Sequence, residues 1–587
     1  MPWNMVTDPL HNTFLSALLA LFPVAVLFWA LAVRRMKGHV AALTVVGATL
    51  LTAVFGFGMP FIPALMSLVY GMLFGLFPIT WIVVTAVFLF SITVRTKRIE
   101  VVKSSIASLT GDRRLQAIII AFSFGSFLEG AAGFGAPVAI SSAMLIGLGF
   151  APLQAAGICL LANTAPVAFG AIGIPIIVAG QVSGVSTMAI SGLVGLNLLF
   201  LSAVIPFYIV ALMDGWKGVK EVWPALLVCG LSFGISQWWT AARLGPFLPD
   251  IIASLVSLTL LAGLLKFWKP RTSGQFSHEA TDSGRESPRY TGGQVFSAWA
   301  PFMILTLLVA AWGIPSVRQT LDSLATVRAE MPGLHNRVVQ DGVPLPAVFT
   351  FNYPGAAGTA ILLAGIASLL MLRVPFSEGA AIFLRTIKTM RFPIITISSV
   401  LGFAYLSNFS GISVALGNAF AGTGPLFPFF SPLIGWLGVF ITGSDTSANA
   451  LFGKLQEVTA LQLGMNPVIT VAANSTGGVA AKMISPQSIA VATAAVGLAG
   501  HEGDIFRFTL KHSLFLALAI GIMTLLQAYV FAWVVPPYDA GGTAVAAQGV
   551  PGGASHSPEG AAYLGIMAVL IALIVFLGRR AGERPRQ

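Results

Sequence analysis

Long runs of apolar residues, separated by short polar segments, extend over almost the whole of this chain. The runs 13–33, 79–93 and 564–577 contain no charged residue. With their uncharged flanks, such runs reach the roughly 20 residues that a helix needs to cross a bilayer. The pattern predicts an all-α polytopic membrane protein.

Composition supports this class. Apolar residues make up 56% of the 587 residues and charged residues only 9%, whereas about a quarter of a soluble domain is charged. The net charge of +11 does not indicate a nucleic-acid partner, because the basic residues are spread over short loops between apolar runs. That distribution is typical of the cytoplasmic loops of membrane proteins.

The basic loops predict the topology. We place seven loops in the cytoplasm: 34–37, 95–114, 217–220, 266–289, 373–391, 507–511 and 579–586. The N-terminus is then outside and the C-terminus cytoplasmic. About 13 transmembrane helices follow, over 14–33, 39–57, 68–94, 153–180, 187–212, 223–240, 249–268, 295–313, 356–372, 392–408, 466–493, 514–535 and 562–578.

The same reading divides the chain into two transmembrane halves, 1–268 and 295–587. The polar segment 269–294 is expected to be a cytoplasmic linker. Segment 314–355 is expected outside the membrane.

Two apolar stretches, 115–150 and 428–463, do not fit as simple spans. Each has two arms too short to cross a bilayer comfortably, separated by a helix-breaking tip. Both are predicted to be re-entrant hairpins. The tip residues are Gly130, Gly133, Gly135 and Pro137 in the first hairpin and Gly443 in the second.

A shift of about 313 residues superposes features of the two halves. It places 39–57 on 352–370, 68–94 on 381–407, the first hairpin on the second, and 153–180 on 466–493. An odd number of crossings separates the halves, so equivalent elements run in opposite directions. This is an inverted-topology repeat, an architecture of secondary transporters with a site at the membrane midplane.

Irregular backbone at membrane depth must be buried in protein or line a cavity. The hairpin tips and two further breaks, at Pro166 and at Gly477 and Gly478, are therefore expected to meet at one polar place. Helix starts there offer free N–H groups to a carboxylate. The candidate substrate-binding residues are Asn163, Thr164, Ser444, Asn474, Ser475, Thr476, Lys482 and Gln487.

Three of the residues at depth are ionisable: Glu129, Asp445 and Lys482. A charge near the bilayer centre costs on the order of 3 kcal/mol or more, so each is a functional candidate. An apolar setting favours the neutral form of a carboxyl group, which makes Glu129 and Asp445 candidates for proton coupling, with Glu129 favoured. The structural alternatives are that Glu129 caps a hairpin arm, Asp445 caps a helix and Lys482 reaches to the interface.

No cofactor and no metal site are predicted. Cys159 and Cys229 lie in apolar stretches without metal-ligand spacing. An intramembrane enzyme would need an acid–base or nucleophile constellation at depth, and two inverted hairpins favour alternating access over a channel. The chain is therefore not expected to be an enzyme.

Four motifs carry a resemblance to a known family: FLEGAAGFGAPVA at 127–139, NTAPVAFG at 163–170, TGSDTS at 442–447 and MISPQSIA at 483–490. They resemble the bacterial lactate permease family over about residues 12–535. The resemblance implies proton-coupled uptake of L-lactate, with D-lactate and glycolate as further substrates, by elevator-type alternating access in the cytoplasmic membrane. A sodium-coupled carrier of small monocarboxylates remains the alternative.

Overall fold

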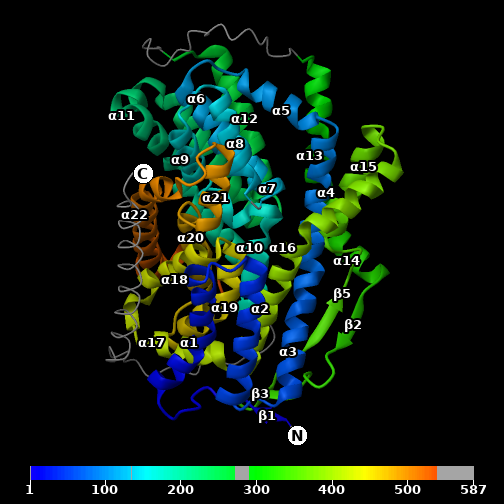
Figure 1. Ribbon diagram of the computed structural model, residues 1–587, viewed down its shortest axis with the longest axis vertical. Helices are drawn as coiled ribbons and strands as arrows, with labels where there is room; N and C mark the ends of the chain where they lie inside the picture. The colour runs from blue at the N-terminus through cyan, green and yellow to red at the C-terminus, as the bar shows by residue number, and fades with distance from the viewer. Residues whose placement is uncertain (1, 134, 271–289, 539–587) are drawn as a thin grey trace.

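The computed structural model describes residues 2–133, 135–270 and 290–538. Figure 1 shows an elongated bundle in which most long helices follow the long axis. In these described ranges, nine helices are long and apolar enough to cross a membrane, or up to ten if a pair bent by 66° forms one span. The prediction of an all-α polytopic membrane protein is confirmed, but the count of about 13 is not. The predicted span 562–578 lies outside the described residues.

The first half begins with a long apolar helix near the N-terminus and ends with α12. Its helices are α1 (Thr13–Phe28), α2 (Gly38–Leu51), α3 (Phe61–Phe74), α4 (Trp81–Arg95), α5 (Arg98–Ala107), α6 (Arg113–Ala117), α7 (Gly125–Ala131), α8 (Ala136–Gly147), α9 (Pro152–Ala162), α10 (Gly170–Ser183), α11 (Thr187–Arg243) and α12 (Pro249–Phe267). Short π-helical or 3₁₀ turns connect several of them: η1 (Trp29–Val33), η2 (Thr52–Gly56), η3 (Gly75–Thr80), η4 (Ile118–Phe124) and η5 (Val167–Phe169).

Most of the predicted linker 269–294 lies outside the described residues, and helices resume at Gly292. The helices of the second half are α13 (Gly292–Gly313), α14 (Pro315–Leu324), α15 (Ala357–Met371), α16 (Phe376–Ser410), α17 (Ile412–Ala421), α18 (Phe427–Thr442), α19 (Asp445–Gln462), α20 (Pro467–Lys482), α21 (Pro486–Ala495) and α22 (Glu502–Tyr529), with the 3₁₀ turns η6 (Gly424–Leu426) and η7 (Ala532–Val534).

Short strands form between α14 and α15, in the segment predicted only to be external. β2 (Val327–Glu330) pairs antiparallel with β5 (Val348–Phe351). A second small sheet has the order β1-β3-β4, in which β1 (Trp3–Asn4) runs parallel to β3 (Val338–Gln340), and β3 is antiparallel to β4 (Val343–Pro344). The N-terminus is thereby fixed to this segment.

Two segments expected as basic loops are helical. The predicted spans 187–212 and 223–240 are joined in α11, which bends at Gly215, where φ is 61° and ψ is −164°. Helix α16 begins at Phe376 instead of near 392. In its first half Ile382, Thr386 and Met390 are buried four residues apart, a helical stripe that the intervening basic residues concealed.

Many large apolar side chains on the outer helices are exposed. Phe55 is 81% exposed, Leu307 71% and Phe515 60%. Exposed apolar surface on this scale is typical of a face that meets another apolar medium, which here is the hydrocarbon of the bilayer.

Helices at equivalent positions of the two predicted halves make matching contacts with the other half. Helix α2 packs on α16, and α15 packs on α4; α1 packs on α17, and α13 packs on α5. In Figure 1, α5 lies toward one end of the molecule and α17 toward the opposite end.

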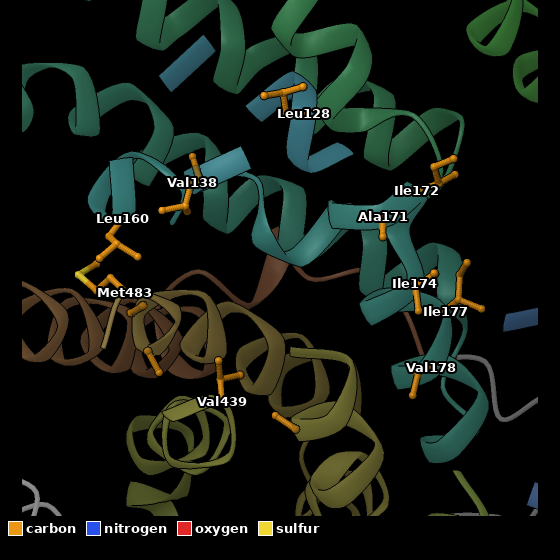
Figure 2. Packing of buried hydrophobic residues seen from close by; sticks show 14 of the residues in the cluster. Leu128, Val138, Leu160, Ala171, Ile172, Ile174, Ile177, Val178, Val439 and Met483 are labelled. Atoms are coloured by element: carbon orange, nitrogen blue, oxygen red, sulfur yellow. The ribbon is translucent and has the colours of Figure 1, made fainter. Parts of the chain in front are cut away.

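The apolar core surrounds the places where helices break. Figure 2 shows Leu128 and Val138 from the first hairpin, Leu160 from α9, and Val439 and Met483 from the second half. Leu160 and Met483 lie against each other in this view. The irregular backbone is therefore enclosed in protein, as the cost of unpaired amides in lipid requires.

Candidate functional site

Glu129 lies near the tip of the first hairpin, on α7. This helix ends at Ala131, and Gly133 and Gly135 follow with φ of 57° and 84°, which glycine adopts readily. The chain then enters α8, with Pro137 in its first turn. The Glu129 side chain is 5% exposed and accepts a hydrogen bond from Asn163 Nδ2 at 3.0 Å.

Asn163 marks the break between α9 and α10, which includes Pro166 as predicted. The break extends further than expected, because Ala171, Ile172 and Gly173 also have positive φ, of 47°, 60° and 72°. Gly170 permits close approach of the hairpin tip, since a Cβ there would lie 2.7 Å from Glu129 Oε1. Glu129 is thus enclosed by the broken helix.

Asp445 is the first residue of α19, at the tip of the second hairpin. The helix cap is its neighbour Ser444, whose side chain accepts a hydrogen bond from Ser447 N at 3.2 Å. Asp445 Oδ2 accepts one from Ser475 Oγ at 2.6 Å and one from Asn449 Nδ2 at 3.4 Å. The carboxyl group is therefore directed to α20 and does not itself cap the helix.

A buried network of amides continues from Asp445. Asn474 Nδ2 donates to Asn449 Oδ1 at 2.9 Å, and Gln456 Nε2 donates to Asn474 Oδ1 at 3.1 Å. Asn449 Nδ2 also donates to the carbonyl of Pro175 at 3.1 Å. This last bond connects the second hairpin to α10 of the first half. Satisfied buried polar networks hold their members in one arrangement.

Lys482 binds the tip of the second hairpin. It is the last residue of α20 and is partly buried. Its Nζ donates to the carbonyl of Gly443 at 2.6 Å, and the carboxyl groups of Glu129 and Asp445 are both within electrostatic range of it. Lys482 is therefore near both acids singled out from the sequence.

Three other candidates differ in position. Thr164 is fully buried, and its Oγ1 has no hydrogen-bond partner among the described residues. Gln487 is exposed and lies against the second hairpin tip, where a Cβ on Gly443 would be 2.5 Å from its Oε1. Thr476 bonds to its own helix, at Ala472 O. Thr476 also accepts from Asn197 of α11, so it does not share the contacts of Asn474 and Ser475.

The helix break expected at Gly477 and Gly478 is absent, because α20 is continuous from Pro467 to Lys482. The break comes later, before α21. The two glycines serve packing instead: a Cβ on Gly477 would lie 1.9 Å from Pro432 O, and one on Gly478 2.3 Å from Asp445 Oδ1. Gly130 is likewise inside α7 and not at its end.

With this geometry in place, the chain was compared with known proteins. The model of the family described as L-lactate permease matches residues 16–531. This chain belongs to that family.

Among its relatives, an L-lactate permease of Bacillus subtilis is 52% identical, with 91% of this chain and 100% of that protein covered. The glycolate permease GlcA of Escherichia coli is 49% identical, with 90% and 98% covered. An L-lactate permease of the same organism is 48% identical, with 91% and 100% covered. The family and the apolar helices together define a multi-pass integral membrane transport protein.

Among solved structures, the Alcanivorax borkumensis YdaH transporter aligns with a TM-score of 0.45 and 15% identity, over 80% of this chain and 89% of that one. The Neisseria gonorrhoeae protein MtrF aligns with a TM-score of 0.43 and 14% identity, over 79% and 83%.

Two polar residues that lie beside the candidate site were not predicted from the sequence to be part of it. Asp250 was placed at the outer end of the span 249–268, yet it is 1% exposed and packed against the first hairpin. Gln237 bonds both Asp250 and the carbonyl of Ala165. The sequence signal was a polar amide within an otherwise apolar segment of α11.

Proposed function

We propose that this chain carries L-lactate across the bacterial cytoplasmic membrane together with protons, and accepts D-lactate and glycolate as related substrates. Relatives about half identical to it are named L-lactate permease and glycolate permease. The observation that carries the proposal is Lys482, which interacts with a carboxyl group from each hairpin, Glu129 and Asp445.

The donors around Lys482 suit a small hydroxy acid. In the proposal, the ammonium group of Lys482 binds the substrate carboxylate, and the N–H groups at the start of α19 add a positive dipole end. Hydroxyl and amide groups of Ser444, Ser475, Asn474 and Asn163 complete the polar wall, with Thr164 and Gln487 beside it.

Charge balance supports proton coupling. A substrate anion that occupies Lys482 competes with Glu129 and Asp445 for the same cation. A carboxyl group that loses its cation in a poorly hydrated site is stabilised by taking up a proton. One lactate and one proton would then enter together without a change in the charge of the site.

We further propose that the two halves, 1–268 and 295–587, form an inverted repeat of about 13 spans with two re-entrant hairpins, 115–150 and 428–463. The N-terminus would lie outside and the C-terminus inside. The reciprocal packing of α2 on α16 and of α15 on α4 supports this arrangement. So do two long helical segments of equal length, Phe61–Arg95 and Phe376–Ser410, each with 35 residues.

Sodium coupling is the second candidate. Two buried oxygens near the site, Thr164 Oγ1 and Asp445 Oδ1, have no hydrogen-bond partner among the described residues. Neutral and acidic oxygens are the ligands that hard cations prefer.

The test is uptake of labelled L-lactate by purified protein in liposomes. An imposed pH gradient, acidic outside, should drive accumulation in sodium-free buffer, and a proton ionophore should abolish it. Accumulation that requires a sodium gradient at equal pH would replace proton coupling by sodium coupling. Absence of lactate exchange in both conditions would remove lactate as the substrate.

A further inference from the structure

Asp250 is a buried acid that the proposed function has not used. It is in the first turn of α12 and 1% exposed. Its Oδ1 accepts a hydrogen bond from Gln237 Nε2 at 2.9 Å. Its Oδ2 is buried and has no hydrogen-bond partner among the described residues. An ionised carboxylate left in this way is far more costly than a neutral carboxyl group.

Asp250 lies against the first hairpin and is linked to the break between α9 and α10. A Cβ added at Gly130 would lie 2.7 Å from Asp250 Cβ, so the first turn of α12 touches α7 at the residue that follows Glu129. Gln237 also donates to the carbonyl of Ala165 at 3.1 Å. Asp250 is thereby connected to both the first hairpin and the α9–α10 break.

Charged groups around Asp250 are few. The charged group that acts on it electrostatically is Glu129, which has the same sign when ionised. Lys482 acts on Glu129 and Asp445. Two carboxyl groups that share a poorly hydrated place do not both ionise readily, because the charge on one disfavours the charge on the other.

We propose that Asp250 and Glu129 together form the proton-binding group of the transport cycle. This rests on the proposed lactate–proton symport. While the positive charge of Lys482 offsets the negative charge of Glu129, the Asp250–Glu129 pair binds the smaller number of protons in the cycle. When the lactate carboxylate binds to Lys482, the pair binds one further proton from the side of the membrane from which lactate enters. It releases that proton to the opposite side when lactate leaves.

A structural role for Asp250 is the competing explanation, because an acid in the first turn stabilises a helix through its dipole. Asp504 provides a matched control. It also lies in the first turn of a helix, α22, but its side chain is 43% exposed. Asp504→Asn removes a first-turn charge from an exposed position on another helix.

The experiment compares two activities of full-length protein in liposomes. Lactate–lactate exchange needs no net proton movement, whereas accumulation driven by a pH gradient does. Asp250→Asn, which preserves the hydrogen bond from Gln237, should keep exchange within about threefold of wild type and reduce accumulation at least tenfold. Asp504→Asn should leave both unchanged, and Asp250→Glu should recover accumulation with an altered pH profile.

Normal accumulation by Asp250→Asn would overturn the inference while leaving lactate–proton symport intact. Failure of the wild-type protein to accumulate lactate with a pH gradient would instead overturn the proposed function. If Asp250→Asn does not fold, as judged by size-exclusion chromatography, Asp250→Glu decides: a pH profile of accumulation identical to wild type would contradict the proposal.

Discussion

The two carboxyl groups proposed from the sequence have different surroundings. Asp445 accepts hydrogen bonds from Ser475 and Asn449, whereas Glu129 accepts one from Asn163 and lies against Gly170 of the broken helix. Each donor stabilises the ionised carboxylate. Glu129 is therefore the better candidate for a group that gains and loses a proton during transport.

This difference gives a prediction for two amide variants. Glu129→Gln should keep lactate exchange and lose accumulation driven by a pH gradient, because the amide preserves shape and hydrogen bonding but binds no proton. Asp445→Asn should have a milder effect. Parallel measurements of exchange and accumulation in liposomes test this, and normal accumulation by both variants would show that neither group carries the proton.

A second prediction at this scale concerns Asn474. Its removal takes one buried hydrogen-bond partner from Asn449 and one from Gln456, so Asn474→Ala should weaken lactate binding by about 1–3 kcal/mol. Thr476→Val is the matched control on the same helix, since Thr476 faces α11 and bonds to its own backbone. It should change binding less. Unchanged affinity in a folded Asn474→Ala protein would place the substrate elsewhere.

At the scale of elements, one buried cation joins the base of the first hairpin to the bend in α11. Arg114 is fully buried and lies 2.8 Å from Asp112, 2.8 Å from Asp214 and 2.7 Å from Glu221. Burial opposes its charge, but the hydrogen bonds that Arg114 donates to these acids raise its pKa above the ordinary value. The guanidinium group therefore stays charged and fixes α6 against α11.

Loss of that group should destabilise the protein. Arg114→Gln leaves three acids without their cation, and breaking a buried ion pair costs about 3–5 kcal/mol. Its neighbour Arg113, which packs over the ring of Phe150, supplies the control. Thermal unfolding in detergent should show a much larger loss for Arg114→Gln than for Arg113→Gln; equal losses would contradict the importance of this cluster.

At the scale of the whole molecule, the reciprocal helix contacts suggest that the two hairpins enter the membrane from opposite sides. Gly111, before α6, and Gln462, at the end of α19, are both exposed and lie near the bases of the two hairpins. The proposed inverted repeat would place Gly111 in the cytoplasm and Gln462 outside.

Single cysteines test this directly. With the buried Cys159 and Cys229 replaced by serine, Gly111→Cys should react with an impermeant thiol reagent only from the cytoplasm, and Gln462→Cys only from outside. A cysteine at Asp8, in the N-terminal segment, should behave like Gln462→Cys. Labelling of both hairpin positions from one side would contradict the inversion.

Much of this protein could be predicted from the sequence because the relevant signals are local. A run of apolar residues is sufficient for a membrane helix, since backbone groups in lipid must bond within their own segment. Glycine and proline in 129–137 and 163–166 mark breaks in the same way, and the structure has breaks there. The rarity of charge at depth identified Glu129, Asp445 and Lys482.

Other features depended on tertiary structure. A helical stripe in α16 was concealed by basic residues, because the burial of Ile382 depends on Phe88 and Ile92 of α4 and on Leu369 of α15. Gly477 resembles a helix breaker, but close packing of α18 leaves no room for a side chain there. Asp250, near one end of a predicted span, was not singled out from the sequence, because its burial depends on the approach of α7 to α12. Sequence thus determined that the chain is a polytopic helical membrane protein and marked several of its helix breaks. Contacts between distant segments decided the extent of the helices and which polar groups lie together, because burial and charge pairing are properties of neighbours in space.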